Sequence, residues 1–196
     1  MTGKRIVGTL GVAALLVLGA SGCGKVAEKA TEKVTEKAIE DQTGGKAKVD
    51  LGNGKVKVKD GSGNSYETDQ DGNVKIKSDD GSTSFTSGDG TKLPDGWPKD
   101  LEPPKGTTIE TATATEGALT VSGSLAAPVK DVYDGLKAQL ADGGYELTAD
   151  SYNTSDGIGS AALTATKGKK DVSVSITEGS DGAKSATVII SVIPQS

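Results

Sequence analysis

Residues 171–177 read Asp-Val-Ser-Val-Ser-Ile-Thr, a strict alternation of aliphatic and hydroxyl side chains. Successive side chains of a strand point to opposite faces, so Val172, Val174 and Ile176 share one face. This alternation is typical of an antiparallel strand that has one covered face and one open face. The segment therefore predicts a sheet that packs a second layer on one side only.

The covering layer follows from the stretch that starts at Pro128. Proline is tolerated in the first turn of a helix, and the glycines at 143 and 144 end one. Between them, apolar residues recur at the spacing of a helical stripe. The stripe consists of Val129, Val132, Tyr133, Leu136 and Leu140. We expect an amphipathic helix here whose stripe meets Val172, Val174 and Ile176.

Further strands are expected on both sides of this helix. A hairpin of residues 107–114 and 119–125 turns at Glu116-Gly117, and strands over 145–151, 160–167 and 186–193 complete the sheet. One helix on one face of an antiparallel sheet is the economical arrangement of these elements. Residues 105–196 are therefore predicted to form an α+β domain.

The last strand breaks the alternation, because Ile189 and Ile193 point to the hydroxyl face. Burial of each such side chain is worth about 1.5–3 kcal/mol. We expect the chain itself to cover them, through the Pro-rich linker 93–104 with Trp97 or through another segment. A ligand or protein groove, and plain exposure, are the alternatives. Trp97, Ile189 and Ile193 are therefore the candidate binding surface.

Residues 46–92 alternate with period two and are divided by Asp-Gly and Asn-Gly turn signals. We expect a short β-meander, or a partly disordered segment because the core is small. One unit recurs after 18 residues, as Gly54-Lys-Val-Lys-Val-Lys and Gly72-Asn-Val-Lys-Ile-Lys. Oxygen ligands alternate over residues 69–73, but glycine stands fourth rather than sixth, so we expect a turn rather than a weak calcium site.

Lysine and glutamate alternate with small residues over 25–41, without glycine or proline. This composition favours a helix, and its thin apolar stripe favours a solvated spacer over a weak homo-oligomer or a surface-lying helix. A period of four residues drifts away from the 3.5 of a coiled coil.

The N-terminus has the pattern of a secretory signal peptide over residues 1–22. Lys4 and Arg5 precede a 13-residue, mostly apolar run, and small residues come before Cys23, the only cysteine. As a helix, this run covers roughly 20 Å, against about 30 Å of bilayer hydrocarbon. The run is therefore too short to be a membrane span.

The leader resembles the lipobox of bacterial lipoproteins, in which two small residues precede a cysteine that is diacylated. Ser21, Gly22 and Cys23 match, whereas Ala20 stands where leucine is usual, so a secreted, unlipidated protein is the alternative. The whole pattern, through Leu93-Pro-Asp-Gly-Trp97-Pro-Lys-Asp100, resembles uncharacterised cell-envelope lipoproteins of Gram-positive bacteria, actinobacteria in particular. The resemblance implies lipidation at Cys23 and attachment to the extracytoplasmic face of the cell membrane. Two or more acyl chains make such an anchor stable.

Composition excludes several classes of function. Of 22 basic residues, Lys4 and Arg5 lie in the leader, which leaves 20 lysines against 27 acids and a formal charge of −7. An acidic chain without arginine is a poor nucleic-acid binder. Histidine, the commonest general base and metal ligand, does not occur. We expect no enzyme, no cofactor and no metal.

The expected organisation has five parts: signal peptide 1–22, lipidated N-terminus and spacer helix 23–45, meander 46–92, linker 93–104 and domain 105–196. The predicted function is a membrane-anchored, non-enzymatic binding or structural module of the cell envelope. Its partner would be an envelope protein or a wall polymer. A carrier that holds an apolar ligand between helix and sheet is the alternative.

Overall fold

The computed structural model describes most of the chain from residue 47 onward. The described residues are 33, 36–38, 40, 41, 47–52, 55–179 and 182–195. Ala20, Ser21, Gly22 and Cys23 lie outside them, as does most of the predicted spacer helix, whose described residues from Lys33 to Asp41 are helical. The lipobox prediction therefore stays a prediction.

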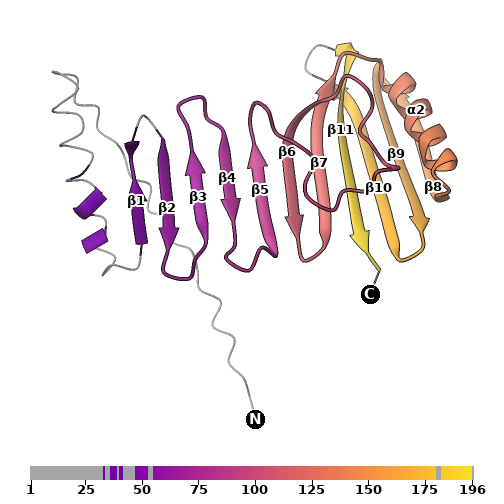
Figure 1. The fold of residues 1–196 in the computed structure, drawn as a ribbon. Coiled ribbons are helices and arrows are strands. Elements are labelled where there is room, and N and C mark those ends of the chain that lie inside the picture. Colours follow the sequence, from indigo (N-terminus) through magenta and orange to yellow (C-terminus); the bar gives the residue numbers. More distant parts are fainter. Residues whose placement is uncertain are drawn as a thin grey trace.

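Eleven antiparallel strands form one sheet, in the order β1-β2-β3-β4-β5-β6-β7-β11-β10-β9-β8 (Figure 1). The first five strands are a meander, in which each strand pairs with the next. They are β1 (Ala47–Asp50), β2 (Val56–Asp60), β3 (Ser65–Thr68), β4 (Val74–Lys77) and β5 (Thr83–Ser87). The period-two pattern of this segment thus forms strands.

The rest of the sheet follows the predicted elements. They are β6 (Thr108–Thr115), β7 (Ala118–Leu125), α2 (Val129–Asp142), β8 (Glu146–Ser155), β9 (Ile158–Lys167), β10 (Lys170–Gly179) and β11 (Gly182–Pro194). The hairpin turn places Glu116 and Gly117 in the left-handed region, as the sequence predicts. Strand β8 runs past its predicted end at Ser151, because a second turn of this type at Asp156-Gly157 lets it pair with β9 up to Ser155.

Strands β5 and β6 pair directly, with Thr83 opposite Thr115 and Ser87 opposite Thr111. The meander and the strands of residues 105–196 therefore belong to one continuous sheet, although the linker separates them in sequence. As expected, one helix, α2, packs on one face of an antiparallel sheet, where it contacts β8 to β11; with eleven strands in that sheet, the fold is dominated by the sheet rather than clearly α+β.

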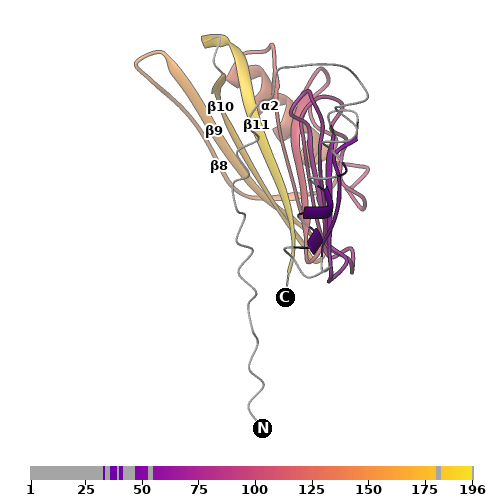
Figure 2. The ribbon, with the colours of Figure 1, turned by 90° about the vertical axis from the view of Figure 1, so that its left-hand side faces the viewer.

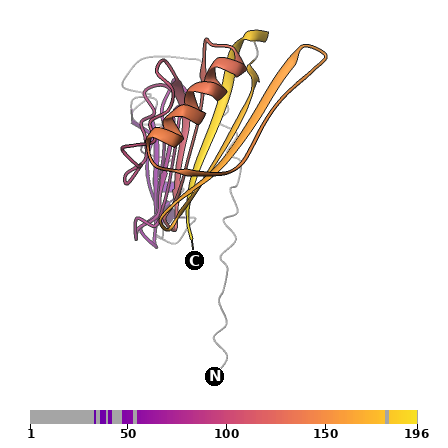
Figure 3. The same cartoon turned by 90° about the vertical axis from the view of Figure 1, so that its right-hand side faces the viewer.

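The core lies between α2 and the C-terminal strands (Figure 3). Val172, Val174 and Ile176 are at most 1% exposed, which confirms their predicted place beneath the helix. Each residue of the predicted helical stripe is buried as well. Leu101 of the linker is fully buried in the same core.

The sheet twists along its length, so that its two ends are inclined to each other (Figures 2 and 3). Directly paired residues point to the same face of a sheet. Through the register, Phe85 shares a face with Thr113, Thr120 and Ser191, which point away from α2. We call this side the helix-free face.

The 18-residue repeat is visible as two equivalent hairpins, β2–β3 and β4–β5. Each of two turns in this segment is hydrogen-bonded to the second turn that follows it in the chain, which lies beside it at the same edge of the sheet. The side-chain oxygen of Asn64 accepts a hydrogen bond from the Asp79 N–H at 3.2 Å, and that of Asn73 accepts one from the Asp89 N–H at 2.7 Å. A Cβ at Gly63 would lie 2.1 Å from the Asp79 carboxylate, so this turn requires glycine.

Candidate binding surface

An apolar stripe crosses the helix-free face of the meander. Val58 lies opposite both Val49 and Tyr66, Tyr66 lies opposite Ile76, and Ile76 lies opposite Phe85. Tyr66 and Ile76 remain 39% and 38% exposed, and none of the described residues forms a second layer above them. The stripe forms because each of these residues alternates with polar neighbours that point to the other face.

The same face continues over β6–β11 as rows of hydroxyl groups. Thr111 and Ser122 share a hydrogen bond of 2.8 Å, and Thr120 and Ser191 share one of 3.1 Å. Ile189 stands within these rows, opposite Ser122 on one side and Ser175 on the other. The centre of this surface therefore mixes aliphatic groups with hydroxyls, whereas a charged residue, Asp171, lies opposite Ile193 at its end.

Ile189 and Ile193 are 42% and 47% exposed on this face. Our expectation that the linker covers them is wrong. Trp97 packs against the core on the opposite side of the sheet, and its indole N–H donates a hydrogen bond to the Leu101 carbonyl. The linker adopts this position because α2 and the sheet already form an apolar core there, which Leu101 extends. The structure thus places Ile189 and Ile193 on the same face of β11, and Trp97 on the other side of the sheet.

Two polar clusters fasten the helix and the linker to the sheet. The Asp150 carboxylate accepts hydrogen bonds from Lys137 and, at 2.9 Å, from the Tyr133 hydroxyl. These contacts, that of Lys137 first, lower the pKa of Asp150. The Asp150 carboxylate is thus paired with a lysine and stays ionised. This arrangement is that of a structural ion pair rather than of an acid–base couple.

The second cluster joins Asp100 of the linker to Lys167 and to Tyr145, whose hydroxyl donates to Asp100 at 3.1 Å. Tyr145 is only 6% exposed. Burial first, and then the neighbouring carboxylate, raise the pKa of Tyr145 to about 12.

We expect the Tyr145 phenol to ionise only near pH 12 in the folded protein. A phenol whose pKa is raised on folding contributes stability that is present below pH ~10 and is lost as the pH rises toward about 12. Ultraviolet titration of wild type and Tyr145→Phe measures this, because the difference between the two curves isolates one phenolate. A difference curve with its midpoint near pH ~10 would contradict the assignment.

Asp69 uses its carboxylate within its own turn, as the turn prediction requires. It accepts hydrogen bonds from the Asp71 and Asn73 N–H groups, at 3.1 and 3.0 Å, and from the Asn73 side-chain amide at 2.9 Å. Among the described residues, no group of three or more histidine, cysteine, aspartate or glutamate side chains could hold a metal ion.

No protein-family model, curated protein or solved structure matches the chain. Within the part that the structure describes, none of the helices is long and apolar enough to cross a bilayer. The helix-free face and the leader are therefore the two features of the chain that point to a function.

Proposed function

We propose that this protein is a lipid-anchored, extracytoplasmic and non-enzymatic binding protein of the cell envelope, and that it docks its partner on the helix-free face. The leader and Cys23 support the location, by their resemblance to a lipobox. Diacylation at Cys23 would hold the chain to the membrane after residues 1–22 are removed.

The distribution of exposed hydrophobic side chains supports the helix-free face as the docking surface. Six large hydrophobic side chains are exposed among the described residues, and five of them share the helix-free face. These five are Tyr66, Ile76, Ile158, Ile189 and Ile193; the sixth, Tyr152, lies on the other face. Isolated exposed hydrophobic residues are normal, whereas several on one face indicate an interaction surface.

The chemistry of the face favours a flat and weakly charged partner. Charged residues make up 25% of the chain, yet the central residues of β2–β5 on this face are all uncharged. Hydroxyl groups such as those of Ser122 and Thr120 offer hydrogen bonds between the aliphatic groups. An envelope protein, or a neutral stretch of wall polymer, meets this description.

The alternative of a carrier places a ligand between α2 and the sheet. Leu136, Leu140, Leu163, Ile176 and Ile190 occupy that space and are each at most 1% exposed. An apolar ligand would have to displace them, which is why we place binding on the outside of the sheet.

Labelling with palmitate tests the anchor. Wild type is expected to incorporate the label and to fractionate with membranes, whereas Cys23→Ser is expected to lose the label completely and to appear in the medium. Ala20→Leu, which restores the usual lipobox residue, serves as the matched control and should label at least as well as wild type. An unlabelled wild type that is secreted with a free thiol would overturn the anchor.

Cross-linking in intact cells tests the docking face. Ile76→Ser combined with Ile189→Ser is expected to abolish the cross-linked species that wild type forms. Tyr152→Ser removes a side chain of similar exposure, 37%, from the opposite face and should leave the species unchanged. Equal losses in the two variants would refute the assignment of this face.

A further inference from the structure

The meander carries a second exposed surface, directly behind the apolar stripe. Its lysines alternate with the stripe residues, so they point to the face opposite to the helix-free one. The register places Lys59 beside Lys48 and, through Ser65, in line with Lys77. We call this the lysine face, and it consists of Lys48, Lys55, Lys57, Lys59, Lys75 and Lys77.

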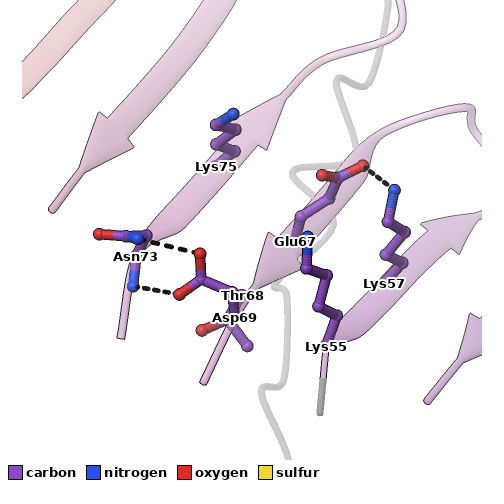
Figure 4. Close-up of a pocket in the computed structure, with 7 residues that line it drawn as sticks. All are labelled: Lys55, Lys57, Glu67, Thr68, Asp69, Asn73 and Lys75. Carbon is purple, nitrogen blue, oxygen red and sulfur yellow. Dashed lines mark hydrogen bonds and ion pairs between the residues drawn. The ribbon is translucent and has the colours of Figure 1, made fainter. Parts of the chain in front are cut away.

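Among the described residues, three acids lie close to these lysines: Asp50, Glu67 and Asp69, which lines the same hollow as Lys55. Glu67 lies between Lys57 and Lys75 and forms an ion pair with Lys57 at 3.1 Å (Figure 4). The Asp50 carboxylate accepts a hydrogen bond from the Gly52 N–H. Among the described residues, none of the other five lysines of the face forms an ion pair within 4.0 Å. Within the described part of the chain, whose net charge over the full sequence is −5, five lysines without a close ion pair thus lie on one face.

Exposure leaves these cations available to a partner. Lys48, Lys55, Lys57, Lys59, Lys75 and Lys77 are all exposed, and α2 covers only the strands at the other end of the sheet. Lys55, Lys57 and Lys75 line one shallow hollow with Glu67 (Figure 4). A broad and flat array of flexible ammonium groups suits an extended anionic surface better than a single small anion.

We propose that the lysine face lies on the anionic phospholipid headgroups of the membrane to which Cys23 is attached; this inference rests on the proposed function. Strand β1, where the face begins, is the first described strand after Cys23, and the Glu36 carboxylate accepts a hydrogen bond from the Leu51 N–H next to β1 at 2.7 Å. The 12 residues between Cys23 and Glu36 reach at most about 40 Å, so the meander stays close to the bilayer.

Because the chain is anchored at Cys23, weak contacts between the lysines and the headgroups are enough to hold the lysine face on the membrane. Each lysine near an anionic surface contributes little alone, but the lipid anchor turns headgroup binding into an intramolecular event with a high effective concentration. With the lysine face on the membrane, the apolar stripe behind it points away from the bilayer. The anchor and the lysines together would present the helix-free face to the envelope.

Vesicle sedimentation tests the inference without any acyl chain. The protein is the chain 23–196 with Cys23→Ser, which keeps every described residue. We expect it to bind vesicles of phosphatidylcholine with phosphatidylglycerol at about 0.05 M salt, not to bind phosphatidylcholine alone, and to dissociate as salt shortens the Debye length. The triple variant Lys59→Gln, Lys75→Gln, Lys77→Gln should lose about tenfold or more of the partition coefficient.

The matched control makes the same change of charge far from the meander. Lys169→Gln, Lys170→Gln and Lys184→Gln remove three exposed lysines and should alter the partition coefficient by no more than about twofold. Unchanged far-ultraviolet circular dichroism shows that both triple variants are folded. Equal losses in the two triple variants would overturn the proposal, because binding would then follow net charge alone.

Two other outcomes would also overturn it. Binding that is lost in Tyr66→Ser with Ile76→Ser, but kept in the lysine variant, would assign the membrane to the apolar stripe. Binding to soluble polyphosphate without binding to anionic vesicles would assign the face to an anionic wall polymer. The palmitate experiment is independent of this assay, so loss of the anchor and loss of the lysine contact are distinguishable.

Discussion

Replacing Ile190 by alanine is expected to lower the free energy of unfolding by about 2–5 kcal/mol. Ile190 is fully buried beneath α2 and lies between Val121 and Val174 on the neighbouring strands. Truncation removes apolar contacts and leaves a cavity that the paired strands cannot close. Urea denaturation of wild type and variant measures the difference.

The adjacent residue provides the control. Ile189 has the same side chain on the same strand, but it is 42% exposed on the helix-free face. Ile189→Ala should change the free energy of unfolding by no more than about 0.5–1 kcal/mol. Similar losses at both positions would mean that the helix-free face is covered in the isolated protein, and would contradict its availability to a partner.

Gly123→Ala is the second change with a large expected effect. A Cβ at Gly123 would lie 2.4 Å from the Thr108 carbonyl oxygen and 3.1 Å from the Ile109 Cα. Both atoms belong to the backbone of β6, so the β6–β7 pair would have to separate where its register already shifts. We expect a loss of about 1–3 kcal/mol in the free energy of unfolding, measured by urea denaturation.

Gly135→Ala is the matched change in open space. Gly135 lies on the exposed side of α2, and a Cβ there would meet nothing within 4 Å. Because alanine favours the helix over glycine, this variant should gain about 0.5–1 kcal/mol. If Gly123→Ala proved equally harmless, the close approach of β6 to β7 at this residue would be refuted.

The C-terminal half of the fold could be predicted from the sequence because each local signal there agrees with the packing. Pro128 and Gly143 delimit α2, the spacing of Val132 and Leu136 identifies its buried side, and the alternation in β10 identifies the covered face. Strand ends were less predictable. Tyr152 to Ser155 carry no apolar alternation, and the Asp-Gly turn that follows them is the signal that we did not use.

The continuity of the sheet could not be read from periodicity. Strand β5 is Thr-Ser-Phe-Thr-Ser, a sequence that does not indicate which strand it pairs with. The linker between β5 and β6 suggests two separate units, whereas the two strands pair directly. The covered face of Val121 and the apolar stripe of Phe85 also lie on opposite sides of the sheet. Alternation within one strand cannot show which way that strand faces relative to another.

The candidate surface was predictable in part. The odd position of Ile189 and Ile193 in the last strand identified two of its residues. Trp97 was misplaced because its burial depends on a core that forms only when distant elements meet. The lysine face had a signal in the repeated Lys-Val-Lys-Val-Lys pattern, but its extent depends on the register across four strands.

The hydrogen bonding between these turns has a consequence for how this protein can change in size. Each 18-residue hairpin pairs with the strands next to it in the sheet, and its turns are joined to later turns through Asn64 and Asn73. A further copy can therefore be inserted without disturbing the C-terminal core. Strands stack at about 4.8 Å, so each duplication would widen the molecule by roughly 10 Å. Duplication of this 18-residue unit would thus lengthen the sheet in steps and increase the distance between β1 and the C-terminal core.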